Sequence, residues 1–406
     1  MALITKGWLF LRQYGIKSAM RQTVQKIIRE TRRLPFRIAE KLITRRRIKA
    51  LHEKAQDKRV FVIIPGIDWN IPLYQRPHQI AVELAKKNNS FVLFFSDQYK
   101  YDRISFDQQI SENLHLYSLT SIKHINSILA NSKDITVVLT WPRNLGLLSK
   151  FKYNRLVYEY IDELSLFYYH TPKMDDDHIH LMRTADLTVA TADKLYENAV
   201  PYAKHLILCE NACDYHFFAS SKNTAVHPII AIHIKNYEAV LGYYGCLAYW
   251  FDYETVLWAA RQRPEWLFVL VGHDFDGTLS VIHDSKLSNI LYVPAQPYTN
   301  LPAFLAGFDI TLIPFVINDV TLSTSPVKVF EYMAAAKPVL SSDIPECRKY
   351  KSVYRYTTAE DFLIKAQELI ELKSNADYLS LLDEEARQNT WESRVNYILN
   401  SLEETE

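Results

Sequence analysis

Short runs of β-branched and aromatic residues, separated by segments with helical periodicity, recur along most of the chain. The first run covers residues 59–65 and leads through a glycine-containing loop (66–74) to a helix that we expect Pro77 to open. Further expected strands lie at 91–96, 135–142, 155–163 and 187–191. Strands that alternate with helices in this way are typical of a parallel sheet with crossover helices.

The same alternation starts again after residue 236. Expected strands lie at 239–247, 266–273, 289–295, 309–315 and 338–343, with expected helices at 252–261, 302–306 and 326–336. The last 30 residues show helical patterns. We therefore expect an α/β fold of two doubly wound sheets with a boundary near residues 216–236. Ligands bind at the carboxyl ends of strands in such sheets, so a cleft between the two domains is the expected site.

Composition agrees with a globular protein of two domains. The chain has 406 residues, of which 48% are apolar and 23% charged. Four cysteines are too few for a disulfide framework, and reduced thiols of a cytoplasmic protein are expected. No G-x-G-x-x-G or P-loop motif occurs among the nine glycines, which excludes both of those nucleotide-binding fingerprints. No apolar run reaches 18 residues, so no membrane-spanning helix is expected.

Residues 1–58 differ from the rest of the chain in charge. They hold sixteen Lys and Arg against four Asp and Glu, a net charge of +12, whereas the remainder carries −11. Apolar residues recur there at helical spacing, at Trp8, Leu11, Ile16, Met20, Val24 and Ile27. This basic helical extension lies on an anionic membrane, binds nucleic acid, or packs on the protein with a solvated basic face. The apolar side favours the membrane, because nucleic acid binding does not require one.

Segment 318–346 has the densest polar pattern. Ser325 is expected to cap, and Pro326 to open, a helix whose first N–H groups form a seat for phosphate. Lys328 adds a positive charge in the first turn, and Glu331 shares its face three residues later. A carboxylate there can accept hydrogen bonds from the vicinal hydroxyls of a ribose. The pattern indicates a site for a nucleotide diphosphate sugar, with a surface Lys–Glu pair on an amphipathic helix as the alternative.

This segment resembles the donor-site helix of GT-B glycosyltransferases of the "glycosyl transferases group 1" superfamily, whose bacterial polysaccharide members carry a stretch like PxKxFEYxAAGKPV. Other segments that resemble the family occur in the same order, and the likeness covers residues 59–404. They are GIDWNIPLYQRPH (66–78), VYEYIDE (157–163), ENACDYHFF (210–218), GYYGCLAYWFD (242–252), RPEWLFVLVG (263–272) and TWESRV (390–395). The resemblance implies a GT-B fold, two Rossmann-like domains that face each other across a cleft.

The implied domains are an acceptor domain (59–220), a donor domain (221–380) and a C-terminal helix (381–406) that crosses back to the first domain. Two departures from the family pattern stand out. Ser323 occupies the position where members often carry a glutamate that contacts the transferred sugar, and Ala336 replaces the usual glycine at the end of the helix. The first departure leaves the donor sugar and the stereochemistry open.

The resemblance and the local chemistry assign donor roles to several residues. Glu331 would hold the ribose and Lys328 the diphosphate, whose charge Lys328 would also stabilise during catalysis. The three residues Ser323, Thr324 and Ser325 would bind phosphate. Gly245 would let the backbone approach the diphosphate, or serves as a turn. His273 would contact the base or a phosphate, or is a structural histidine.

Acceptor roles fall to the first domain. Asp162 follows the expected strand 155–163 and would act as general base in an inverting enzyme, or orient hydroxyls in a retaining one; Glu163 and a helix cap are the alternatives. Residues of the loop after the first strand would form an acceptor subsite, namely Asp68, Trp69, Arg76 and His78, although Arg76 also suits a plain helix start. Asp175, Asp176 and Asp177 are expected to be a solvated run in a loop, and no metal or other cofactor is expected.

We therefore expect a metal-independent glycosyltransferase that moves a sugar from a nucleotide diphosphate sugar to a growing, lipid-linked bacterial surface glycan, such as a capsule or the O-antigen of lipopolysaccharide. It would be cytoplasmic and bound to the inner face of the membrane through residues 1–58, with no nucleic acid partner. Two alternatives stay open. A nucleotide-sugar epimerase would use the same fold without an acceptor, and a non-catalytic nucleotide-sugar-binding scaffold would fit the loss of a glutamate at Ser323.

Overall fold

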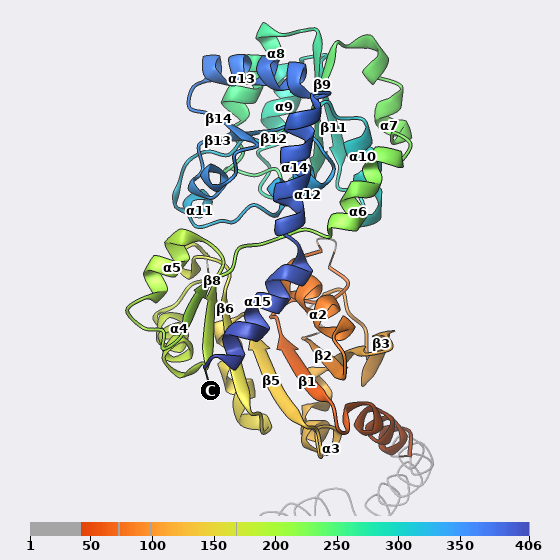
Figure 1. Ribbon diagram of the computed structural model, residues 1–406, viewed down its shortest axis with the longest axis vertical. Coiled ribbons are helices and arrows are strands. Elements are labelled where there is room, and N and C mark those ends of the chain that lie inside the picture. Colours follow the sequence, from red (N-terminus) through yellow and green to blue (C-terminus); the bar gives the residue numbers. More distant parts are fainter. Residues whose placement is uncertain (1–41, 72–73, 98–99, 168, 406) are drawn as a thin grey trace, which may run out of the picture.

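The computed structural model describes residues 42–71, 74–97, 100–167 and 169–405. It contains two units stacked end to end, each built around its own sheet (Figure 1). The first sheet has eight strands in the order β3-β4-β2-β1-β5-β6-β7-β8, and the second has six in the order β11-β10-β9-β12-β13-β14. All neighbouring strands are parallel except β3 and β4. The predicted pair of doubly wound sheets is confirmed.

The first sheet takes its strands from the first half of the chain. They are β1 (Arg59–Ile64), β2 (Ser90–Ser96), β3 (Asp107–Ser111), β4 (Leu114–Ser118), β5 (Asp134–Leu139), β6 (Arg155–Tyr160), β7 (Leu187–Ala190) and β8 (Leu206–Leu208). Its helices are α2 (Arg76–Lys86), η1 (Leu119–His124), α3 (Ile125–Ile128), η2 (Pro142–Lys150), η3 (Leu164–Leu166), α4 (Pro172–Thr184) and α5 (Asp193–Ala199). The expected strands omit β3, β4 and β8 of this sheet and the strand at Val353–Tyr356 of the second. β3 is a polar edge strand and β8 is only three residues long, so neither carries a strong apolar signal.

Central strand β1 is apolar from Val60 to Ile64 because helices cover both faces of the sheet. Val60, Val62 and Ile64 belong to the core on one face, whereas Phe61 and Ile63 belong to the core on the other. This period of two is what an extended backbone imposes on successive side chains.

The second sheet is formed by β9 (Ala239–Tyr244), β10 (Trp266–Gly272), β11 (Ile290–Pro294), β12 (Ile310–Ile313), β13 (Val339–Ser342) and β14 (Val353–Tyr356). Around and after it lie α6 (Tyr215–Ala219), η4 (Ser220–Asn223), α7 (Pro228–Ala231), η5 (Ile234–Asn236), α8 (Tyr253–Gln262), α9 (Ser280–Ser285), η6 (Tyr298–Asn300), α10 (Leu301–Ala306), α11 (Asp319–Leu322), α12 (Val327–Ala334), η7 (Pro345–Lys349), α13 (Ala359–Leu372), α14 (Ala376–Gln388) and α15 (Trp391–Glu403). The sequence places the change of unit near 216–236, and the structure has no strand between Leu208 and Ala239 within this described stretch.

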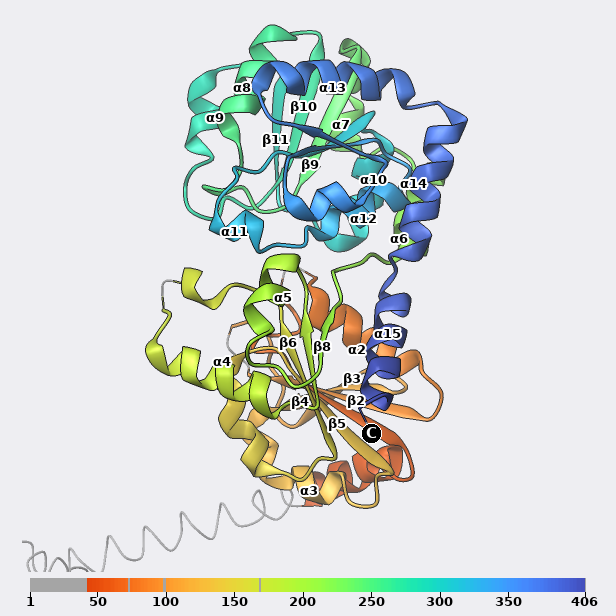
Figure 2. The ribbon, with the colours of Figure 1, turned by 60° about the vertical axis from the view of Figure 1, so that its left-hand side comes forward.

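The chain crosses between the units twice, after β8 and between α14 and α15. The two crossings lie side by side, because the Cys213 amide donates to the Asn389 carbonyl and the Trp391 amide donates to the Cys213 carbonyl, both at 3.2 Å. α14 runs along the second unit and α15 packs on α2 of the first (Figures 1 and 2). Trp391 is buried in the core beneath α2. The C-terminal segment therefore returns to the first unit at residues 389–391.

Part of the basic extension precedes β1. Residues 42–55 are helical, and Leu51 and Ala55 are buried in the first core. The amphipathic pattern between Trp8 and Ile27 lies outside the described residues. Within the described ranges, no helix combines the length and the apolar character that a membrane crossing requires.

Candidate active site

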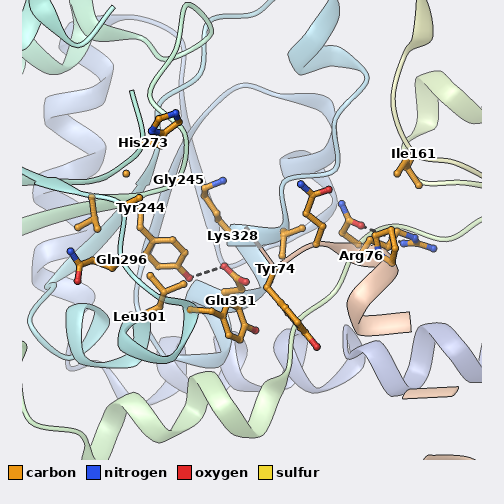
Figure 3. Close-up of a pocket in the computed structure, with 18 of the residues that line it drawn as sticks. Tyr74, Arg76, Ile161, Tyr244, Gly245, His273, Gln296, Leu301, Lys328 and Glu331 are labelled. Atoms are coloured by element: carbon orange, nitrogen blue, oxygen red, sulfur yellow. Dashed lines mark hydrogen bonds between the residues drawn. The ribbon is translucent and has the colours of Figure 1, made fainter. Parts of the chain in front are cut away.

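A cavity of about 280 Å³ opens between the two units, at the carboxyl ends of both sheets. Figure 3 shows residues of the two units on opposite sides of it, with Arg76 and Ile161 across from Gly245, Lys328 and Glu331. The lining includes six residues that the sequence singles out: Arg76, Asp162, Gly245, His273, Lys328 and Glu331. Six others do not line it: Asp68, Trp69, His78, Ser323, Thr324 and Ser325.

Helix α12 begins at Val327, with Pro326 as its N-cap, one residue later than expected. The prediction that Ser325 caps this helix is wrong, since no side chain caps it. Instead, Ser325 Oγ accepts the Asn211 amide at 3.2 Å and its carbonyl accepts Asn211 Nδ2 at 2.8 Å. Ser325 therefore fastens the helix to the linker between the units. Val327 and Lys328, the first two residues of α12, line the cavity.

Ser323 and Thr324 also lie away from the cavity. Ser323 is buried, and Thr324 Oγ1 donates to the Val320 carbonyl at 2.6 Å. Both residues complete the turn that follows α11. The hydroxyl groups of residues 323–325 are therefore not placed to bind a phosphate in the cavity.

Lys328 reaches the cavity from the first turn of α12. Its Nζ lies over the rings of Tyr243 and Phe315, 5.7 and 6.0 Å from their centroids, and forms no ion pair with any described residue. Burial lowers the pKa of the ammonium group, an effect that the Glu331 carboxylate partly opposes. An ammonium group without a carboxylate partner in a half-buried site is suited to bind an anion.

Two glycines make this geometry possible. A Cβ on Gly245, whose φ is +146°, would lie 2.2 Å from Lys328 Cε. A Cβ on Gly272 would lie 1.7 Å from the Gly245 carbonyl oxygen, so the ends of β9 and β10 are in direct backbone contact. Gly245 is among the residues that the sequence indicates, whereas Gly272 is not, although it directly precedes His273 at the end of the expected strand 266–273. That position was the available signal.

Glu331 lies one turn after Lys328 and is only 6% exposed. Tyr244 Oη donates to Glu331 Oε2 at 2.8 Å (Figure 3). Burial raises the pKa of the carboxyl group to about 7, although the Tyr244 hydrogen bond and the Lys328 charge act to lower it. Glu331 is thus an acceptor at the wall of the cavity whose ionisation falls near neutral pH.

Asp162 follows β6 and faces these residues from the first unit. Its side chain is exposed to the cleft and has no hydrogen-bond partner among the described residues. The surrounding protein displaces bulk water and raises its pKa to about 6. Such a carboxylate is ionised at neutral pH and still basic enough to accept a proton.

Glu163, the alternative base, is engaged elsewhere. It is the N-cap of η3 and accepts hydrogen bonds from the Ser165 amide and hydroxyl, Tyr160 Oη and Asn198 Nδ2. Burial acts to raise the pKa of Glu163, but the bonds from Ser165 and Tyr160 outweigh it and hold the pKa below its usual value. The capping role that the sequence left open for Asp162 belongs to Glu163.

Three of the residues expected in an acceptor subsite instead build the loop after β1. Asp68, 3% exposed, accepts the amides of Lys100, Tyr101 and Asp102. The Trp69 ring contacts His78 and Phe94 edge-on, and the Trp69 carbonyl accepts a bond from His78 Nε2 at 3.0 Å. These side chains face protein rather than the cavity, because a long loop must satisfy its own polar groups.

Arg76 lines the cavity, but its guanidinium group is committed to the protein. Nε donates to Glu159 Oε1 at 2.9 Å in a buried ion pair, and Nη1 donates to the Glu210 carbonyl at 3.0 Å. Arg394 from α15 donates to the same carbonyl at 3.1 Å. Arg76 therefore holds the linker in place and does not face an acceptor phosphate.

Aromatic residues that the sequence analysis missed close one side of the cavity. Tyr74 of the first unit and Tyr298 of the second lie 5.2 Å apart between ring centroids, and Gln79 Nε2 donates to Tyr298 Oη at 3.2 Å. Tyr298 also stacks on Phe217 with centroids 4.8 Å apart. The contact joins the two units beside Glu331. A tyrosine just after the expected strand 289–295 was the available signal.

The acidic run at 175–177 lies in helix α4, not in a loop as expected. Asp177 pairs with Lys173, and Asp175 with His170, each at 2.7 Å. Across the described ranges, no three His, Cys, Asp or Glu side chains are grouped so that they could hold a metal ion. Metal independence itself stays a prediction.

Comparisons with known proteins support the architecture. No family model matches the chain. A curated relative, the teichuronic acid biosynthesis glycosyltransferase TuaH of Bacillus subtilis (strain 168), is 24% identical over 232 residues. The match covers 54% of this chain and 57% of TuaH, so it spans little more than half of either protein.

Solved structures match over most of the chain. Sucrose-phosphate synthase from Thermosynechococcus elongatus superposes with a TM-score of 0.66 and 11% identity, covering 86% of this chain and 98% of that one. Anabaena HepE in complex with UDP superposes with a TM-score of 0.60 and 14% identity, covering 86% and 100%. The chain has the GT-B fold. The resemblance to GT-B glycosyltransferases that the sequence indicates is thereby confirmed.

Proposed function

We propose that the protein is a glycosyltransferase that transfers a sugar from a nucleotide diphosphate sugar to a glycan. The observation that carries this proposal is the cavity between the units, where Lys328 and Glu331 lie on one side and Asp162 on the other. Such a transfer needs a group that binds the anionic diphosphate, a group that accepts hydrogen bonds from the donor's hydroxyls, and a basic carboxylate. The glycosyltransferase name of TuaH supports the reaction class.

The donor would occupy the edge of the second sheet. Its diphosphate would lie at the start of α12, where Lys328, the helix dipole and the close backbone at Gly245 and Gly272 favour negative charge. Its ribose would lie against Glu331. The HepE structure, which has the same fold, contains UDP, and this supports a nucleotide donor.

The chemical step would use charges already in place. As the bond from the sugar to the diphosphate breaks, negative charge grows on the leaving group, and Lys328 would stabilise it without a metal ion. In an inverting reaction, Asp162 would take the proton of the acceptor hydroxyl, since its raised pKa of about 6 makes it a better base than an ordinary aspartate. In a retaining reaction, Asp162 would instead orient a hydroxyl group.

The acceptor would be a growing, lipid-linked glycan of the bacterial surface, reached from the inner face of the cytoplasmic membrane. TuaH is named for the biosynthesis of teichuronic acid, which supports a polysaccharide acceptor. The helix at 42–55 supports membrane contact, because Leu42 and Ile43 are more than half exposed beside the exposed Arg45 and Arg46. Basic and apolar groups together favour an anionic lipid surface.

A panel of nucleotide sugars tests the reaction. The purified protein is incubated with each sugar, and release of nucleotide diphosphate is measured with and without short glycan acceptors. We expect one donor to be hydrolysed slowly and to react faster with an acceptor. Conversion of a donor into its epimer would identify an epimerase. Tight binding without turnover of any donor would identify a non-catalytic binding protein.

Membrane contact is tested by co-sedimentation with vesicles. The full chain should bind vesicles that contain anionic lipid and should bind less at high salt, because salt screens surface charge. A chain lacking residues 1–41 should bind less and keep its activity on a short acceptor. The deletion stops there because Leu51 and Ala55 belong to the core. Equal binding to neutral and anionic vesicles would contradict the role of the basic segment.

A further inference from the structure

Tyr244, the last residue of β9, is fixed to helix α12 at both of its ends. Its amide donates to Tyr332 Oη at 3.2 Å, and the two rings meet edge-on with centroids 5.0 Å apart. At the other end, its phenol donates to Glu331 Oε2 at 2.8 Å (Figure 3). The residue is buried and also lines the cavity. Its hydroxyl group therefore has a defined position relative to the Glu331 carboxylate.

This hydrogen bond determines which oxygen of the Glu331 carboxylate is free to bind a ligand. Oε2 receives the phenol, whereas Oε1 has no hydrogen-bond partner among the residues that the structure describes. An ionised carboxylate has acceptor sites on both oxygens, so the group can bind the phenol and a ligand hydroxyl at once. With one oxygen held, rotation of the carboxylate is restricted and the other oxygen keeps one direction.

We propose that Tyr244 is a positioning residue for the donor, whose phenol holds Glu331 so that the second carboxylate oxygen accepts the ribose hydroxyl groups. The inference rests on the proposed function, because it needs a ribose at Glu331. A phenylalanine would make the same ring contact with Tyr332 but would leave the carboxylate without its donor. The hydroxyl group alone is therefore the feature under test.

The charge state of Glu331 gives this role a measurable signature. The titratable groups that face it are Lys328 and Tyr332 on α12, Tyr244 on β9, Tyr298 after β11, and Cys213 in the linker. Burial raises the pKa of each of the three tyrosines and of Cys213, so these groups stay neutral around pH 7. Glu331, with a pKa of about 7, is the acidic group of this set that changes charge there, while burial lowers the pKa of the Lys328 ammonium group.

The sign of the pH effect follows from the hydrogen bond. Burial raises the pKa of Glu331, and the bond from Tyr244 opposes this because it stabilises the ionised form. Removal of the phenol therefore raises the pKa further. Ribose hydroxyls bind best to the ionised carboxylate, so donor affinity should fall as the pH drops through the pKa. In Tyr244→Phe this fall should begin at a higher pH.

The experiment measures affinity for UDP-glucose and for its 2′,3′-dideoxy analogue between pH 6 and 9. At pH 7, Tyr244→Phe should bind UDP-glucose ~3- to 10-fold more weakly, as expected for one hydrogen bond. The wild type should discriminate strongly against the dideoxy analogue, and Tyr244→Phe should discriminate less. Part of the lost affinity should return at pH 9, where Glu331 is ionised in both proteins. A purely structural role would not produce this recovery.

Tyr378→Phe is the matched control. Tyr378 is a buried tyrosine of the same unit, lies outside the cavity, and donates to the Ser352 carbonyl at 2.6 Å. Its loss should lower stability to a similar degree and leave the affinity for UDP-glucose and its pH dependence unchanged. Glu331→Gln is the second variant, which keeps an oxygen acceptor but removes the titrating carboxyl group, so its affinity should lose the pH dependence. It tests the assignment of the pH effect to Glu331 even if Tyr244→Phe does not fold.

The outcomes that would contradict the role of Tyr244 differ from the outcome that would contradict the proposed function. Wild-type affinity in Tyr244→Phe, or equal losses for UDP-glucose and the dideoxy analogue at every pH, would overturn the role of Tyr244 and leave the proposed function intact. Pronounced pH dependence in Glu331→Gln would overturn it as well. A wild type that binds no nucleotide sugar of the panel would overturn the proposed function together with this inference.

Discussion

The two edges of the cleft use their polar residues differently. At the edge of the second sheet, four of the seven expected donor residues, Gly245, His273, Lys328 and Glu331, line one cavity. At the edge of the first sheet, Asp162 is the expected residue whose polar group faces the cavity without a hydrogen-bond partner in the described part of the chain. The polar groups of the other expected acceptor residues form hydrogen bonds or ion pairs within the protein.

The difference has a physical cause. The donor edge is built from strand ends in direct backbone contact and from the first turn of a helix, so neighbouring residues in the sequence already share a face. The acceptor edge is built from loops, which include the described segments 66–71 and 100–106, and their polar groups need internal support. Asp68 and Asp102 supply this support by accepting amides from each other's loop. Polar residues in such loops therefore form hydrogen bonds within the loops and do not face a ligand.

Removal of the basic carboxylate at the acceptor edge should have the largest effect on activity. Asp162→Asn should reduce transfer ~10²–10⁴-fold while donor affinity stays near the wild-type value, if Asp162 takes the acceptor proton. Wild-type transfer should also decline as the pH falls through about 6, since the carboxylate becomes protonated there. Transfer rates are measured across this pH range for both proteins.

Glu163→Gln is the control for Asp162, because the amide oxygen can still cap η3. Its transfer rate and pH profile should resemble those of the wild type. An unchanged rate in Asp162→Asn would exclude a base role. The anomeric configuration of the product, determined by NMR, then decides between inverting and retaining chemistry.

Loss of the cation at the donor edge should have the next largest effect. Lys328→Ala should reduce turnover ~10²–10³-fold, because charge on the leaving diphosphate grows in the transition state. Glu331→Ala should mainly weaken donor binding, by ~1.5–3 kcal/mol. Steady-state kinetics separate the two, since the first lowers kcat and the second raises KM. Wild-type behaviour in both variants would remove the donor assignment.

The backbone contact between Gly272 and Gly245 can be tested for its part in donor binding. Gly272→Ala places a Cβ against the Gly245 carbonyl, so the backbone must shift, at a cost of ~1–3 kcal/mol in stability and with weaker donor binding. Gly146→Ala is the matched control, since a Cβ there meets no described atom within 4 Å. Thermal unfolding and donor titration of both variants check this. Equal behaviour of the two would show that the close approach is unimportant.

The smallest expected effect concerns the loop after β1. Trp69→Phe should change the acceptor KM less than ~2-fold while it lowers stability by ~0.5–3 kcal/mol, because Trp69 packs on His78 and Phe94 rather than in the cavity. Acceptor kinetics and denaturant unfolding give the two values. A large rise of the acceptor KM at unchanged stability would restore Trp69 to an acceptor subsite and end the contrast between the two edges.

Much of the architecture follows from local sequence. The continuous apolar run of β1 and the repeated alternation of strands and helices predict two parallel sheets, because these patterns express backbone geometry that acts over a few residues. The pairing of Lys328 with Glu331 on one helical face is local in the same sense. The edge strand β3 escaped prediction because it is polar and largely exposed.

Contacts between distant segments were decided by the tertiary structure. The strand order β11-β10-β9-β12 brings Gly272 onto Gly245 and Tyr244 onto Glu331, 27 and 87 positions apart in the chain. The packing of α2 on the first sheet brings Arg76 to Glu159 of β6, and the linker brings Asn211 to Ser325. The type of a residue and its position in the local sequence pattern determine which hydrogen bonds and ion pairs its side chain can form. Which bond it makes depends on the partners that folding brings within reach, since a buried polar group must be satisfied wherever it comes to lie.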